Sequence, residues 1–95
     1  MAAPALVALL ALSAAAPDVT VEPQADGRLR LTIVFANTNP EMYARAMLRL
    51  QAEAARQCRG RGRPVSVGAM EVNPVRERRG RLALTETYRC GPPPA

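Results

Sequence analysis

The sequence predicts a small two-layer α+β domain after an N-terminal signal peptide: a four-stranded antiparallel sheet, in the order β-β-α-β-β, with one helix packed on one face. Three observations lead to this prediction. The 95 residues, 48% of them hydrophobic, suffice for one small core. Apolar and polar side chains alternate over 28–35, which is typical of a strand in a sheet with one covered face. Apolar side chains then recur at helical spacing over 43–58, so one helix can cover that face.

Residues 1–16 are predicted to be a cleaved signal peptide. They carry no charged side chain and contain an apolar run, 5–12, followed by small residues. This run covers about 12 Å as a helix against a hydrocarbon core of about 30 Å, so we expect no transmembrane segment. Cleavage after Ala15 fits best, because a cut after Ala16 would leave Pro17 in the first position. The leader predicts a periplasmic or secreted protein; the alternative is an Ala-rich helix retained in a cytosolic one.

A strand pair is expected at the start of the mature domain, which we place at 17–90. Val19 and Val21 alternate with polar residues, and the segment 23–27 ends in the Asp-Gly pair that is typical of hairpin turns. The next strand begins at Arg28. Its core-facing side chains are predicted to be Leu29, Leu31, Ile33 and Phe35.

The helix is predicted to begin after Asn39, a good N-cap, with Pro40 in its first turn. It should end at about Cys58, and Pro64 prevents it from resuming. The predicted core-facing stripe is Tyr43, Met47, Leu50, Ala54 and Cys58. The side chains expected on the solvated side are Arg45, Arg49, Glu53 and Arg56, with Glu53 and Arg56 as an i,i+3 ion pair.

Two further strands are expected, one from Val65 to about Val75 and one over 82–90. Pro74 interrupts the first, which indicates an edge strand or a bulge. Glu86 falls on the apolar side of the second strand and would require a bulge or a frayed end. Residues 91–95 are expected to form an extended, disordered Pro-rich tail.

Cys58 and Cys90 are predicted to form a structural disulfide. They are the only two cysteines, and they fall at the end of the helix and the end of the last strand, where a bridge would clamp helix to sheet. Closing a loop of this size contributes about 3 to 4 kcal/mol in the chain-entropy model. A redox role is the alternative, but the chain has neither the CxxC spacing nor a histidine to lower a thiol pKa.

The basic residues form two clusters that are candidates for anion binding. All 13 are arginine, against eight acidic residues, giving a formal charge of +5. Such a field attracts nucleic acid, acidic lipid headgroups or acidic polysaccharide, although a GC-rich genome and simple solvation would also explain the arginines. If the last two strands pair, the clusters lie at opposite ends of the sheet. The clusters are Arg59, Arg61 and Arg63, and Arg76, Arg78, Arg79 and Arg81.

The string Arg61-Gly62-Arg63-Pro64 resembles the core of the AT-hook, a family of short segments that bind the A·T minor groove. The resemblance covers four residues. It implies that Arg61 and Arg63 enter the groove and that Gly62 permits a close backbone approach. The family's Pro before the first Arg is replaced by Gly60, and no basic residue follows Pro64.

The residue types that are missing exclude most catalytic machinery. The chain has no His and no Lys, so it cannot form a Ser-His or Cys-His pair, a Schiff base or an imidazole zinc site. We therefore expect no metal, no cofactor and no enzymatic activity. The alternative is an enzyme that works through a carboxylate such as Glu71 or Glu86.

These observations favour a small exported, disulfide-stapled, non-enzymatic binding or structural module of the bacterial cell envelope. Its expected partners are an acidic protein surface or an anionic lipid or polysaccharide, contacted through the arginine clusters. The rival hypothesis, which the composition favours less, is a DNA-associated protein that uses the AT-hook-like string.

Overall fold

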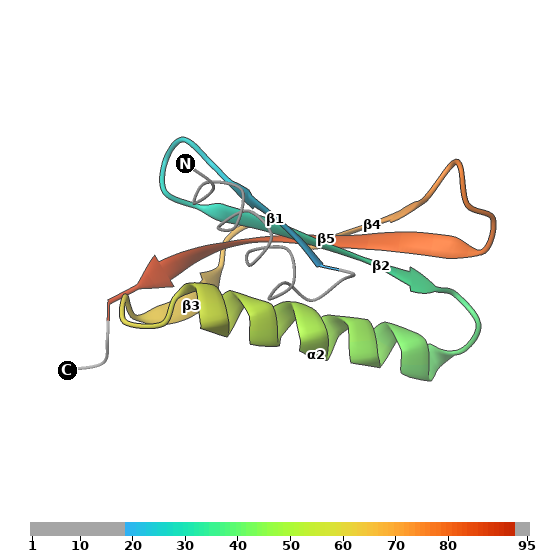
Figure 1. Cartoon of the computed structure of the whole chain (residues 1–95), viewed down its shortest axis with the longest axis horizontal. Helices are drawn as coiled ribbons and strands as arrows, with labels where there is room; N and C mark the ends of the chain where they lie inside the picture. The colour runs from blue at the N-terminus through green and yellow to red at the C-terminus, as the bar shows by residue number, and fades with distance from the viewer. Residues whose placement is uncertain (1–18, 93–95) are drawn as a thin grey trace, which may run out of the picture.

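The computed structural model describes residues 19–92, and within them the predicted α+β class is confirmed: one helix lies against one face of an antiparallel sheet (Figure 1). The predicted signal peptide, 1–16, and residues 93–95 of the predicted tail lie outside the described residues. The elements in chain order are β1 (Val19–Pro23), β2 (Leu29–Ala36), α2 (Pro40–Gln57), β3 (Arg63–Ser66), β4 (Glu71–Pro74) and β5 (Arg81–Gly91).

The sheet has five strands rather than the four that the sequence predicts. Its order is β1-β2-β5-β3, with β4 also paired to β5, and all pairs are antiparallel. The strand expected over 65–75 is in fact two short strands that follow one another along the same edge of β5. The chain leaves the sheet between them, at a bend where Gly68 has a φ of +94°, a conformation that costs glycine little. Pro74 ends β4 on this edge, as its missing N–H requires.

The core lies between α2 and the face of the sheet that α2 covers, which we call the covered face. The alternation of β2 is confirmed. Its four apolar side chains are all buried, and Asn39 caps the helix by accepting a hydrogen bond from the N–H of Met42 at 3.1 Å. The buried core residues of the sheet and helix are Leu29, Leu31, Ile33, Phe35, Leu84 and Tyr88, and Ala46, Leu50 and Ala54.

The buried face of α2 differs from the predicted stripe in one important respect. Glu53, expected on the solvated side, is buried, while Tyr43 and Met47 are only partly buried. The carboxylate is tolerated because its partners lie within the next turn. Arg56 donates to both of its oxygens, at 3.2 and 2.9 Å, and Gln57 donates at 2.8 Å. The predicted ion pair between Glu53 and Arg56 is therefore confirmed, but between a buried carboxylate and an exposed guanidinium.

Glu86 is accommodated without the predicted bulge or frayed end. The register of β5 with β2 is regular through this position, where Glu86 lies opposite Leu31. The carboxylate accepts hydrogen bonds from Ser66 and from Tyr88. Hydroxyl donors on the same face thus make a charged residue compatible with a regular strand.

No helix of residues 19–92 lies over the opposite side of the sheet, which we call the open face and which is polar. Thr32 and Thr85 share a hydrogen bond at its centre, with 3.0 Å between their hydroxyl oxygens. Arg30 lies between two carboxylates, at 4.0 Å from Glu22 and 3.7 Å from Glu71. This is the alternation expected of an antiparallel sheet with one solvated face.

Candidate functional site

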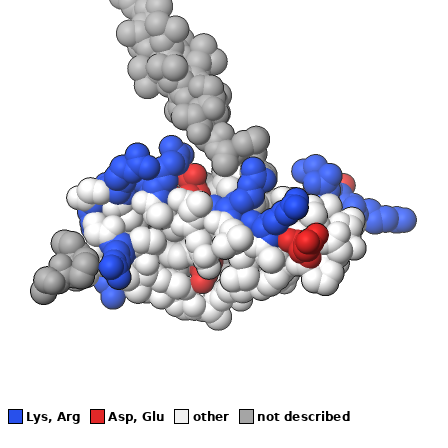
Figure 2. Space-filling view, turned by 90° about the horizontal axis from the view of Figure 1, so that it is seen from below, with Lys and Arg blue, Asp and Glu red and all other residues white. Residues whose placement is uncertain are grey.

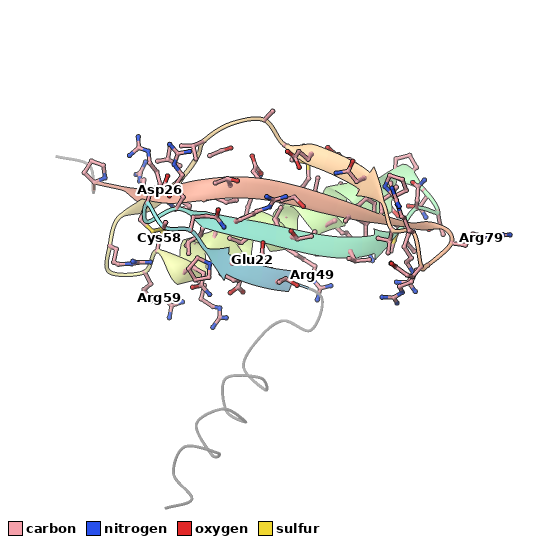
Figure 3. All side chains as sticks on the ribbon, turned by 90° about the horizontal axis from the view of Figure 1, so that it is seen from above. Glu22, Asp26, Arg49, Cys58, Arg59 and Arg79 are labelled. Atoms are coloured by element: carbon pink, nitrogen blue, oxygen red, sulfur yellow. A yellow bond between two sulfur atoms is a disulfide. The ribbon has the colours of Figure 1, made fainter. Side chains whose placement is uncertain are left out.

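The two arginine clusters lie at opposite ends of β5, as predicted from the strand order. Pro64, beside the first cluster, pairs with Cys90 near the end of β5, whereas Arg81 of the second cluster begins the strand and pairs with Ala36. Figure 3 shows Arg79 at one extremity of the sheet and Cys58 and Arg59 at the other. Seen from the helix side, arginine side chains lie at both ends of the molecule and also between them (Figure 2).

The disulfide end comprises the last turn of α2, residues 58–63 and the end of β5. Cys58 and Cys90 form the predicted disulfide, with an S–S distance of 2.04 Å. Gly91, expected to begin the tail, is instead the last residue of β5; it is buried and pairs with Arg63. The bridge and the strand pairing together hold this end of the chain against the sheet.

The loop at the disulfide end is built closely onto the sheet. Gly62 has a φ of +112°, and a Cβ placed there would collide with the carbonyl oxygen of Gly91. Only glycine satisfies both requirements. Arg61 donates from its guanidinium to the carbonyl of Gln57 at 3.1 Å. Arg63 is already part of β3.

This geometry bears on the AT-hook resemblance. A groove-binding segment must offer its backbone and both arginines to DNA. Here the Gly62 backbone packs on Gly91, Arg61 is engaged with the helix end, and Arg63-Pro64 pairs with β5. The four-residue string therefore serves as a connection within the fold.

The hairpin-tip end is the turn between β4 and β5, residues 75–81. Backbone hydrogen bonds close it, from Val75 N–H to the Arg81 carbonyl at 3.0 Å and from Arg78 N–H to the Val75 carbonyl at 3.2 Å. A third, from Asn37 N–H to the Gly80 carbonyl at 2.8 Å, ties it to the loop before α2. The tip is thus held by backbone contacts, and it forms the turn between β4 and β5 at one end of the sheet (Figure 1).

The tip arginines resemble Arg59 and Arg63 of the disulfide end, which are exposed and form no ion pair with any residue of 19–92. Arg76, Arg78 and Arg79 are exposed and Arg81 is half-buried. Within residues 19–92 none of the four forms an ion pair, although Glu77 lies among them in sequence. By contrast, Arg28 pairs with Asp26 at 3.0 Å, and Arg30 and Arg56 are also paired.

An apolar groove adjoins the hairpin-tip end. It has a volume of about 550 Å³ and lies between the end of β2 and the first half of α2. Its floor includes Phe35 and Met42, and its lining includes Arg45 and Arg81. The groove therefore combines an apolar surface with guanidinium groups.

Sequence reasoning missed one basic residue at the disulfide end. Arg89 is exposed on β5 and lies opposite Val65 of β3, one position from the bridge. The alternation over 82–90 places Arg89 on the open face. Its nearness to Arg63, however, follows only from the β3–β5 register, which the sequence did not fix.

The two carboxylates considered as catalytic alternatives have different surroundings. Glu71 is on the exposed strand β4 and faces Arg30 at 3.7 Å. Glu86 lines a cavity with Ser66 and Tyr88. Burial raises the pKa of Tyr88, and the hydrogen bond to Glu86 and its negative charge raise it further, so this phenol stays protonated near neutrality.

Three comparisons of the chain, with protein-family models, with curated proteins and with solved structures, find no match. In the described part of the chain, no group of three or more His, Cys, Asp or Glu side chains is placed to hold a metal ion. Nor does any helix between residues 19 and 92 combine the length and apolar character needed for a membrane crossing. The functional inference therefore rests on the arginine clusters, the groove and the cavity.

Proposed function

We propose that this domain is an exported, non-enzymatic binding module of the bacterial cell envelope that contacts anionic partners through its arginines, chiefly those of the hairpin tip. One observation carries the proposal. Four guanidinium groups gather within the turn 75–81, which backbone hydrogen bonds hold in place, and none has an ion-pair partner among the described residues. Guanidinium groups match the geometry of phosphate and carboxylate oxygens.

The groove beside the tip favours an anionic lipid over the other expected partners. A lipid presents a negatively charged headgroup together with apolar chains. The groove offers Arg45 and Arg81 together with the apolar side chains of Phe35 and Met42. The tip and the groove could therefore contact one lipid surface at the same time.

The disulfide supports the proposed address. Disulfides persist in oxidising compartments and are rare in a reducing cytosol. An export test uses the intact, non-reduced mass of the protein expressed from its own start codon in a Gram-negative host. We expect a periplasmic species that lacks residues 1–15 or 1–16. A full-length cytosolic species with two free thiols would contradict export.

The binding test compares two variants that lose equal charge. Arg76→Gln/Arg78→Gln/Arg79→Gln removes three tip charges, and Arg59→Gln/Arg61→Gln/Arg63→Gln removes three at the disulfide end. The probe is a vesicle containing phosphatidylglycerol, with phosphatidylcholine vesicles as the uncharged reference. We expect the native protein to bind the anionic vesicles and to dissociate as salt is added. The tip variant should bind at least about tenfold more weakly, and the control variant should lose less.

Two results would contradict the proposal. The first is an absence of binding even at low ionic strength, and the second is an equal loss in both variants, which would show that net charge alone matters. The DNA rival predicts a different pattern. It requires a preference for A·T-rich duplexes that survives Arg76→Ala and Arg78→Ala but not Arg61→Ala.

A further inference from the structure

Glu86 occupies a position on the covered face where the alternation of β5 otherwise places core residues. Its neighbours on that face, Leu84 and Tyr88, are buried. One carboxylate oxygen accepts the hydroxyl of Ser66, with 2.6 Å between the oxygens, and the other accepts that of Tyr88 at 2.9 Å. The chain contains 13 arginines, yet within residues 19–92 none of them forms an ion pair with Glu86.

A cavity opens beside this carboxylate because the neighbouring edge of the sheet is interrupted. β3 ends at Ser66, opposite Tyr88, and β4 begins at Glu71, opposite Thr85. Val67 still donates its N–H to the carbonyl of Thr87 at 2.9 Å, and residues 68–70 leave the sheet. The cavity has a volume of about 370 Å³, near the small end of the range for ligand pockets. Besides Glu86, its lining residues are Met47, Gln51, Pro64, Ser66, Met70 and Tyr88.

The charge of this cavity is negative. Glu86 is the single carboxylate in the lining, and the lining contains no arginine. Tyr88 retains its proton near neutrality, so it acts as a donor to Glu86 and adds no second negative charge. The cavity is thus an anionic recess in a protein whose surface is strongly basic.

We propose that this cavity binds a primary alkylammonium group, with Glu86 as its counterion. Each carboxylate oxygen already accepts one hydroxyl, and each has a further lone pair to offer. An ammonium group suits these remaining positions because its three N–H donors rotate freely, whereas the donors of a guanidinium form a fixed fork. Gln51 also lines the cavity, and its side chain has an amide carbonyl that an ammonium group can use as an acceptor.

The walls fit the alkyl part of such a ligand. Met47 and Met70 contribute flexible, polarisable thioether side chains that adapt to an aliphatic stem, and Pro64 adds apolar ring surface. The ligand cannot be a lysine of a second copy, since the chain contains none. The two sources of this chemistry are a free alkylamine and a lysine side chain of another protein.

The test is a titration of the ¹⁵N-labelled domain, disulfide intact, with butylammonium chloride, followed by amide chemical shifts. Butanol, of similar size but uncharged, is the reference ligand, and Nα-acetyl-lysine methylamide represents the protein source. The test variant is Glu86→Gln. The matched control is Glu71→Gln, which removes an equal charge from the neighbouring strand but outside the cavity.

We expect saturable shifts at Met47, Gln51 and Met70 with butylammonium and none with butanol. Glu86→Gln should weaken binding at least about tenfold, while Glu71→Gln should leave it unchanged. A lysine derivative that binds as tightly as butylammonium would identify a protein partner, and weaker binding would identify a free amine.

The proposal is overturned if butylammonium and butanol give the same shifts on the native protein, a comparison that does not depend on the folding of any variant. Retention of full affinity in Glu86→Gln would also overturn it. Vesicle binding by the tip is a separate property. Its failure would leave the ammonium site unaffected, because the two sites share no residue.

Discussion

The disulfide end and the hairpin-tip end have similar compositions but hold their arginines in different ways. At the disulfide end the backbone of 59–63 is fixed by the bridge, by the β3–β5 pairing and by the packing of Gly62 on Gly91. Arg61 is used there to satisfy the carbonyl of Gln57. At the tip, backbone bonds close the turn. In the part of the chain that the structure describes, no arginine side chain of the tip makes a hydrogen bond or an ion pair, and the ion pairs of that part include no arginine of 59–63 either. An arginine-rich string can therefore be part of a scaffold or a free binding surface, and only its neighbours decide which.

Removal of the bridge should have the largest effect and should act on one end. The variant Cys58→Ala/Cys90→Ala loses a cross-link between residues 32 apart. We expect the free energy of unfolding to fall by about 3 to 4 kcal/mol, measured by urea denaturation. Hydrogen exchange should accelerate first at the amides of β3 and last at the tip. Equal acceleration at both ends would contradict the distinction between them.

Two glycine substitutions should have the next largest effects, and their effects on stability should differ between the two loops. Gly62 and Gly80 both have positive φ, +112° and +77°, but a Cβ at Gly80 meets no atom within 4 Å. Gly80→Ala should cost about 1 kcal/mol of stability, the backbone term alone. Gly62→Ala should cost about 2 to 3 kcal/mol, because the backbone of Gly91 must also move. Similar losses in thermal denaturation would show that the disulfide-end loop can relax.

Acidic pH should destabilise the C-terminal end of α2 more than the hairpin tip. Burial raises the pKa of Glu53, but the hydrogen bonds from Arg56 and Gln57 and the positive charge of Arg56 outweigh burial, so the pKa lies below its ordinary value of 4.5. A lowered pKa stabilises the fold at pH values above the ordinary pKa. This stabilisation is lost as the pH falls through the lowered pKa. Glu53→Gln should be less destabilising than Gly62→Ala at neutral pH and should flatten the stability profile below pH 4.5. An unchanged profile would show that Glu53 does not contribute.

Arg79→Gln should have the smallest effect on stability. Arg79 is exposed and forms no ion pair within residues 19–92. We expect a change within about 0.5 kcal/mol, together with weaker binding to anionic vesicles. A larger loss of stability would show that the tip arginines support the fold after all.

Much of this fold could be predicted because its signals are local. The strand at β2 follows from strict alternation, the helix start from Asn39 and Pro40, and the disulfide from two cysteines at element ends. The break between β3 and β4 could not be predicted, because a single glycine at position 68 does not show that the chain leaves the sheet there. The break becomes clear only from the pairing of both strands with β5. The surroundings of Glu53 and Glu86 were also predicted wrongly. Each carboxylate accepts hydrogen bonds from donors such as Gln57 and Ser66, and these contacts are known only from the structure.

The site was predicted less completely than the fold. Both arginine clusters and their separation follow from the order of the strands. Arg89 and the groove depend on strand register and on the position of α2, neither of which the residue pattern determines. The cavity at Glu86 depends on the gap between β3 and β4. The sequence predicts a single strand in that region, and so it does not indicate the gap.

The position of β5 in the sheet determines when this domain can fold. It is the last strand of the described chain, and β2, β3 and β4 all pair with it. The β2–β5 pairing joins segments far apart in sequence. Such contacts form slowly, because a long loop must close first. Before β5 begins to be synthesised at Arg81, only the β1–β2 hairpin can form its full set of strand pairs. A chain that has not yet reached β5 therefore lacks the strand with which β2, β3 and β4 pair.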